Sequence, residues 1–238
     1  MAKILAINEI YNANLKKYTK IDGIMAIFLL ILFIGFLVLL AVLSIDLQVI
    51  ENSMTQLYCT SNLIIILITV LFVVLRKQKI ETIGIIKGQW KKSCAIGLVL
   101  AIIFFVGNFG IEFFLHKGSL KPFKNIMLLT IYFLIIAFCE ELVFRGYIQT
   151  RLHGFIKNRI IAVLIGALMF TVIHFPSGII INRMTFYTFG NFITGNIGWI
   201  INLFVMHIIW DFTYKKTNSL YGSILSHWIS NLAGSLLL

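Results

Sequence analysis

Two adjacent glutamates and an arginine, Glu140, Glu141 and Arg145, stand inside a long apolar segment of the chain. Residues 126–137, which precede them, have the composition of a helix that spans a bilayer. A charged side chain at the centre of a membrane helix costs at least about 2.5–3.5 kcal/mol on insertion scales. Such groups persist where they face protein or water and partner one another, so these three residues are predicted to be functional.

Helix geometry predicts different roles for the two glutamates. Glu141 and Arg145 are four residues apart, so they share a helix face and can form an ion pair. Glu140 is turned about 100° away and is not directly neutralised by that arginine. An unneutralised carboxyl group in an apolar setting is a candidate general base or acid. Glu140 is therefore the predicted catalytic group, and Glu141 and Arg145 are predicted to support it.

Clusters of further polar residues interrupt the apolar pattern in the last three predicted spans. Depth in the membrane can be counted at the helical rise of 1.5 Å per residue, starting from the nearest basic residue on the predicted cytoplasmic side. Four groups then lie roughly 17–23 Å from that side. The hydrocarbon core of a bilayer is ~30 Å thick, so these groups lie at or beyond its middle. Convergence on one depth predicts a single site. Its members are Glu140, His174, His227 and Asn231.

Two pairs of these polar residues share a helix face. His227 and Asn231 are four residues apart, and an imidazole and an amide on one face can donate hydrogen bonds to a developing oxyanion. His207 and Asp211 have the same spacing but lie nearer the predicted cytoplasmic end of their span. They are predicted to be structural residues near a solvated helix end, with an accessory polar pair at the cytoplasmic mouth of the site as the alternative.

Composition predicts an all-α fold, a polytopic transmembrane bundle of about seven to eight spans. Of the 238 residues, 60% are hydrophobic and 12% are charged, against roughly 25% charged in soluble domains. Residues 1–125 are predicted to form a cytoplasmic tail and three peripheral helices, and residues 126–238 a four-helix catalytic core. The expected spans are 24–44, 58–75, 94–114, 126–151, 159–175, 196–214 and 219–238.

The segment 177–195 mixes aromatic residues with Asn182, Arg183 and Asn191. It is predicted to be interfacial or re-entrant, with an eighth, poor span as the alternative. The first 23 residues are mixed and polar, which does not fit a cleaved signal peptide. Three scattered cysteines indicate neither a disulfide framework nor a cysteine zinc site.

Lysine and arginine are distributed unequally between the two predicted sides of the membrane. One side carries only Lys117, Lys121, Lys124 and Arg183. The positive-inside rule therefore predicts a cytoplasmic N-terminus and accounts for the net charge of +11 without a nucleic-acid partner. The other side holds Lys3, Lys16, Lys17, Lys20, Arg76, Lys77, Lys79, Lys87, Lys91, Lys92, Arg151, Lys157, Arg159, Lys215 and Lys216.

Three motifs on separate spans resemble those of the CPBP intramembrane proteases. They are Glu140-Glu141-x-x-x-Arg145, Phe170-x-x-x-His174 and His227-x-x-x-Asn231, in that order. This family includes the type II CAAX prenyl endopeptidases and the Abi proteins linked to bacteriocin self-immunity. The resemblance covers roughly residues 126–235. The chain departs from it at His207 and Asp211, where small residues are expected.

The resemblance implies peptide-bond hydrolysis inside the membrane. In that interpretation Glu140, assisted by His174, activates water, while His227 and Asn231 stabilise the oxyanion. The alternative makes Glu140, His174 and His227 ligands of a zinc ion that activates the water. The chain lacks His-Glu-x-x-His, the compact helical zinc-protease motif. We therefore predict a site without a metal and retain zinc as the alternative.

The family suggests a substrate, a peptide bond near the C-terminus of a prenylated CAAX-type protein, cleaved near the cytoplasmic side. The predicted partners are thus the lipid bilayer and a peptide or prenylated protein. Alternatives are bacteriocin or peptide processing, self-immunity, a proton-coupled transporter and a non-catalytic membrane scaffold. The composition, rich in Ile, Lys and Phe, favours a multi-pass protein of a prokaryotic plasma membrane.

Overall fold

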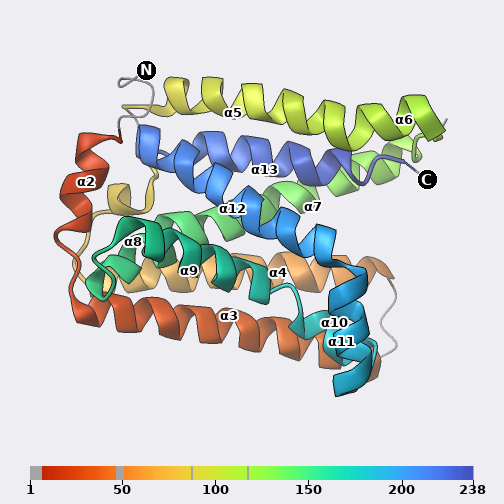
Figure 1. The fold of residues 1–238 in the computed structure, drawn as a ribbon, viewed down its shortest axis with the longest axis horizontal. Coiled ribbons are helices and arrows are strands. Elements are labelled where there is room, and N and C mark those ends of the chain that lie inside the picture. The colour runs from red at the N-terminus through yellow and green to blue at the C-terminus, as the bar shows by residue number, and fades with distance from the viewer. Residues whose placement is uncertain (1–6, 47–50, 87, 117, 238) are drawn as a thin grey trace.

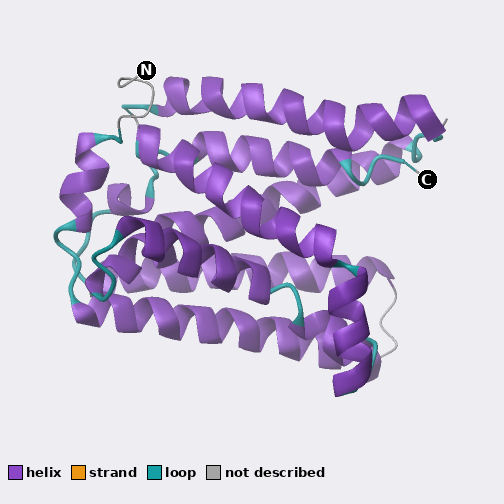
Figure 2. Cartoon of the chain, viewed as in Figure 1, coloured by secondary structure: helices purple, strands orange, loops and turns teal. Residues whose placement is uncertain are grey.

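The computed structural model describes residues 7–46, 51–86, 88–116 and 118–237. Within these ranges the chain is a bundle of helices without a strand, joined by loops at its two ends (Figure 2). This confirms the all-α fold. Predictions that involve Lys3, Lys87 and Lys117 lie outside the described residues.

Most of the long helices run along one axis of the molecule, and short ones cross its ends (Figure 1). The first half contains α2 (Glu9–Leu15), α3 (Lys20–Asp46), α4 (Glu51–Leu75), η1 (Ile80–Ile83), α5 (Trp90–Phe105), η2 (Val106–Gly110) and α6 (Ile111–His116). The second half contains α7 (Phe123–Glu141), η3 (Leu142–Ile148), α8 (Gln149–Arg151), η4 (Leu152–Gly154), α9 (Arg159–Val172), α10 (Pro176–Ile181), α11 (Phe186–Gly195), α12 (Ile197–Thr217) and α13 (Tyr221–Ala233).

Among the described residues, six helical segments are long and apolar enough to cross a membrane. They are Lys20–Ile45, Thr55–Leu75, Trp90–Leu115, Phe123–Gly154, Arg159–Ile181 and Ile197–Thr217. The predicted seventh span, 219–238, is shorter than expected, because α13 ends at Ala233. At 1.5 Å per residue its 13 residues extend only about 20 Å. Beyond it the chain turns back, and Leu237 pairs with Leu120.

The segment 177–195 does not cross the bundle. It forms α10 and α11, which have 6 and 10 residues and are too short for a span of ~30 Å. Pro176 starts α10, and a proline is favoured at this first helical position. Thr185 and Thr188 form a capping box that starts α11. The arrangement fits the interfacial or re-entrant prediction and contradicts an eighth span.

Helices α5 and α13 approach each other closely at two glycines. A Cβ atom at Gly97 would overlap the backbone of Gly222, and one at Gly222 would overlap the backbone of Ser93. Ser93 joins the same contact, because its Oγ accepts a hydrogen bond from the Gly222 amide at 2.9 Å and donates to the Ser219 carbonyl at 3.0 Å. This contact fixes α13, the helix that carries His227 and Asn231.

Gly97→Ala is expected to lower the free energy of unfolding by about 1–3 kcal/mol, because the added methyl group overpacks a backbone contact. Thermal unfolding in detergent measures the change. Gly35→Ala is the matched control, since nothing lies within 4 Å of a Cβ at that position in α3. Equal melting temperatures for the two variants would contradict the close α5–α13 contact.

Candidate active site

One cavity of about 460 Å³ collects the polar residues that converge in depth. Four elements of the second half line it, and η2 contributes from the first half. Its bottom is aromatic, formed by Phe170 of α9 and Trp210 of α12. The sequence-predicted residues that line this cavity are Glu140, His174, His227 and Asn231.

Glu140 lies where a regular helix changes its geometry. α7 is an α-helix up to Glu141, and the following seven residues form the π-helix η3. Single π-helical turns inside α-helices are rare and frequently occur at functional sites. The side chain of Glu140 is 13% exposed, whereas that of Glu141 is fully buried. The helix thus presents one glutamate to the cavity and buries the other in protein.

Glu141 bridges two different helices through one carboxylate oxygen. Its Oε1 lies 2.9 Å from Arg145 Nη1, which confirms the predicted ion pair, although this part of the chain is π-helical. The same oxygen lies 2.8 Å from His227 Nδ1 of α13. All three side chains are at most 4% exposed. Glu141 is therefore more than a partner for Arg145, because it also holds the His227 ring.

His227 is held in one orientation by groups on three sides. An ionised carboxylate can only accept a hydrogen bond, so Nδ1 is the nitrogen that donates to Glu141. The ring is stacked on Trp210, with centroids 3.9 Å apart and planes 15° apart. Nε2 then faces Glu140, at 3.7 Å from Oε2. This nitrogen is the one available for chemistry.

Arg145 is packed among aromatic rings as well as paired with Glu141. Its guanidinium carbon lies 4.5 Å from the centroid of Phe170 and 5.1 Å from that of Trp210. A guanidinium over a ring face is attracted by the ring's quadrupole, most strongly where water is absent. The same two rings also contact His227. Arg145 thus packs against the aromatic rings at the bottom of the cavity without lining the cavity itself.

His174 offers its second nitrogen to the cavity. Its Nδ1 lies 2.8 Å from the carbonyl oxygen of Phe170, one helical turn earlier, and a carbonyl can only accept. In the neutral ring Nε2 is therefore the acceptor. The imidazole packs edge to face with Trp199 of α12, at a centroid distance of 6.1 Å. An acceptor nitrogen in this cavity suits a group that orients a water molecule.

One lining residue, Asn108 of η2, was not predicted from the sequence. Its Nδ2 donates to the Oγ of Ser230 at 3.1 Å and to the Ser230 carbonyl at 3.3 Å. Ser230 directly precedes Asn231. Helix α5 and its π-helical continuation thus brace the site, although this half of the chain carries no recognised motif. A lone asparagine in an apolar segment is the only sequence signal that points to it.

The structure places His207 and Asp211 away from the cavity. Both are buried, which agrees with a structural role and contradicts the alternative of an accessory pair at a cytoplasmic mouth. Asp211 lies 2.6 Å from Lys215 Nζ, one turn further along α12. His207 Nε2 lies 3.4 Å from Gln149 Oε1 and packs against Phe170. The aliphatic part of the Lys215 side chain and the neighbouring helices cover His207 and Asp211, so the two residues are part of the packed interior.

Comparison with protein families concerns the half of the chain that holds this cavity. Residues 122–233 match the family model described as Type II CAAX prenyl endopeptidase Rce1-like. The match supports the resemblance of this part of the chain to the CPBP/CAAX protease family. It extends from Pro122, before α7, to the last residue of α13, and includes every sequence-predicted site residue. No curated protein and no solved structure matches the chain.

The described residues of the CAAX protease domain do not gather a metal-binding set of side chains. In the part of the chain that the structure describes, no group of three or more His, Cys, Asp or Glu residues is placed to hold a metal ion. His227 Nδ1 is occupied by Glu141, and His174 Nδ1 by a backbone carbonyl. The zinc alternative at Glu140, His174 and His227 stays a prediction, because a histidine that ligates zinc through Nε2 commonly donates its Nδ1–H to a carboxylate or carbonyl, as these two rings do.

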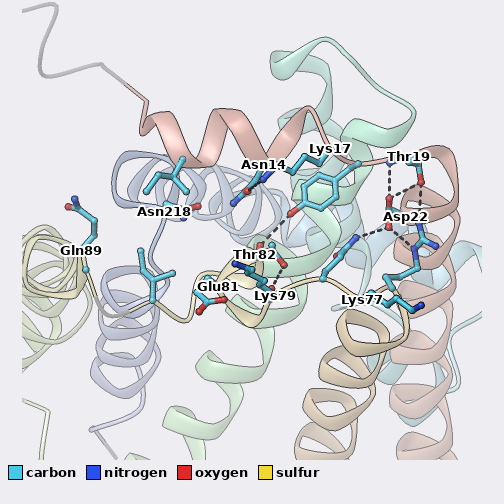
Figure 3. A pocket seen from close by; sticks show the side chains of 16 residues that line it. Asn14, Lys17, Thr19, Asp22, Lys77, Lys79, Glu81, Thr82, Gln89 and Asn218 are labelled. Atoms are coloured by element: carbon cyan, nitrogen blue, oxygen red, sulfur yellow. Dashed lines mark hydrogen bonds and ion pairs between the residues drawn. The ribbon is translucent and has the colours of Figure 1, made fainter.

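A second, larger cavity of about 770 Å³ is lined by residues of α2, of the start of α3 and of the α4–α5 connection (Figure 3). Its wall is a polar network in which Asp22 accepts hydrogen bonds from Thr19, Arg76 and Gln78. The hydrogen bond that Arg76 donates to Asp22 raises the pKa of the Arg76 guanidinium. None of the predicted site residues lines this cavity, so its size does not make it the catalytic one.

Proposed function

We propose that this membrane protein is an endopeptidase that hydrolyses a peptide bond inside the membrane. The single observation that carries the proposal is the cavity in which Glu140, His174 and His227 meet, with Asn231 beside them. The CPBP/CAAX protease domain supports a protease, and the helices support a membrane setting. Together they favour proteolysis over transport or a scaffold function.

In the proposed reaction Glu140 removes a proton from a water molecule held with the help of His174 Nε2. The water oxygen attacks the scissile carbonyl carbon, and the carbonyl oxygen becomes an oxyanion. With both ring nitrogens protonated, His227 donates to Glu141 through Nδ1 and to the oxyanion through Nε2, while Asn231 donates through its amide. When the C–N bond breaks, Glu140 returns its proton to the departing amine.

Glu141 and Arg145 are positioning residues in this mechanism. Glu141 accepts the Nδ1–H of His227 and fixes the orientation of the ring, as the buried carboxylate does in a serine-protease triad. Arg145 offsets the charge of Glu141 within the same helix. Neither side chain lines the cavity, so neither is expected to touch the substrate.

Cleavage of a synthetic peptide tests the function. The purified protein in detergent is given a fluorogenic farnesylated CAAX peptide and the same peptide without the lipid, because the family suggests the prenylated substrate. His227→Ala is expected to lower the cleavage rate about 10²–10³-fold by removing an oxyanion donor. Lys79→Ala, in the second cavity, is the control and keeps the parent rate. A chelator is expected to leave the rate unchanged.

Cleavage that persists in His227→Ala would contradict the assigned mechanism. Cleavage of both peptides at similar rates would support the protease and remove the prenyl requirement. If neither peptide is cleaved, the prenylated substrate is wrong, and a library of apolar peptides offered to parent and His227→Ala tests the protease itself.

A further inference from the structure

The catalytic cavity is closed on the side that faces the basic end of the molecule. From Glu141 to Gly154 every residue of the α7–η4 helix is buried. Towards the other end of this helix, by contrast, Phe123 and Ile131 are exposed. Glu140 lies at the boundary between the two halves. The exposed part of this helix next to Glu140 therefore lies towards the Phe123 end.

The residues that line the cavity also change from buried to exposed towards this end of the molecule. Met206 and Trp210 of α12 are buried at the bottom of the cavity, while Asn202 and Trp199 of the same helix are exposed. The first and last of these residues, Trp199 and Trp210, are about 16 Å apart along the helix. On α13 the exposed member is Gly234, just beyond the helix end. The rim thus lies where α12 begins and α13 ends, at the end of the bundle that also carries α6 and α11 (Figure 1).

A sealed polar layer separates the catalytic cavity from the cavity at the basic end. The two cavities share no lining residue. Arg151 lies in this layer with no exposed surface and donates hydrogen bonds to the Gly146 carbonyl at 2.7 Å and to Gln78 Oε1 at 2.7 Å. Tyr147 and Tyr214 are fully buried beside it.

The charges of the described residues differ strongly between the two ends. The rim end carries Lys121, Lys124 and Arg183. The opposite end carries the basic residues between α2 and α3, of the α4–α5 connection, of the α8–α9 turn and of the end of α12. Figure 3 shows part of that basic end, with Lys17, Lys77 and Lys79 around its cavity. Basic residues accumulate on the cytoplasmic side of membrane proteins.

We infer that the catalytic cavity opens on the side of the membrane away from the cytoplasm and takes apolar peptide segments of exported proteins. This inference rests on the proposed function for cleavage itself. It replaces the prediction of a site that opens towards the cytoplasm. A prenylated tail made in the cytoplasm would have to cross most of the bilayer to reach Glu140. An exported segment anchored in the outer half of the membrane meets the rim directly.

Thiol labelling in intact cells tests the direction of opening without requiring activity. Cys59, Cys94 and Cys139 are first replaced by alanine. Asn202→Cys and Ser235→Cys then place single thiols at two independent points of the rim, and Lys79→Cys places one at the basic end. A membrane-impermeant maleimide is added to intact cells and, in parallel, to permeabilised cells. Size-exclusion chromatography in detergent confirms that each variant is folded.

Both rim variants are expected to react in intact cells, and Lys79→Cys only after permeabilisation. Rim thiols that react only after permeabilisation, together with Lys79→Cys, would overturn the inference. Rim thiols that react in neither preparation would also overturn it, because the cavity would then be closed. Labelling does not depend on turnover, so a failure here is distinct from a failure of the peptide-cleavage assay.

Discussion

Replacing Glu140 by glutamine is expected to lower kcat/KM for peptide cleavage on the order of 10²–10⁴-fold, the contribution of a well-placed general base. The amide has nearly the same shape as the carboxylate but cannot accept the proton of the attacking water. Because the Glu140 side chain borders the cavity at 13% exposure, the swap leaves no buried charge without a partner. Thermal unfolding in detergent should therefore match that of the parent.

Two further substitutions make this measurement specific. Glu140→Asp keeps the carboxylate but withdraws it by one methylene group, so an intermediate rate is expected. Glu81→Gln is the matched control, since this glutamate is exposed at the basic end of the molecule and lines the other cavity. A Glu140→Gln rate within tenfold of the parent would remove Glu140 as the general base.

Glu141→Leu is expected to lower the free energy of unfolding by about 3–5 kcal/mol, the usual cost of breaking a buried ion pair from one side. Arg145 would keep its charge in a fully buried position without its carboxylate. His227 would lose the acceptor of its Nδ1 proton at the same time. Both the stability and the cleavage rate are therefore expected to fall. Equilibrium unfolding in detergent measures the free energy of unfolding.

The double variant Glu141→Leu with Arg145→Met separates the two functions of Glu141. Replacing a buried ion pair by apolar residues of similar volume is often neutral or stabilising, so most of the lost stability should return. Cleavage should stay low, because His227 still lacks the group that orients its ring. A double variant that regains parental kcat/KM would show that Glu141 serves stability alone.

The sequence predicted those features of the site that depend on position along a helix. Apolar length placed the spans, and four-residue spacing predicted the ion pair of Glu141 with Arg145. Depth counted along each helix predicted that Glu140, His174 and His227 would meet, and they line one cavity. These predictions succeeded because helical rise and rotation are nearly constant, whatever surrounds the helix.

Features that depend on contacts between helices were missed or wrong. The bond from Glu141 to His227 needs the register of α13 against α7, which no spacing within either helix determines. Asn108 reaches the site only because Gly97 and Gly222 let α5 approach α13. The burial of Asp211 follows from neighbouring helices that cover Lys215, whereas linear distance from a helix end had suggested a wet position.

The ion pair of Glu141 with Arg145 also has a consequence for the order in which the protein is made. Both residues belong to one helix, so they can neutralise each other as that segment leaves the translocon. His227 is supplied by α13, the last helix of the chain described. Until α13 is synthesised and docks, Glu140 has no oxyanion donors beside it. A nascent chain without α13 therefore carries an insertable but inert helix, and the proposed peptidase activity is expected only once α13 has docked.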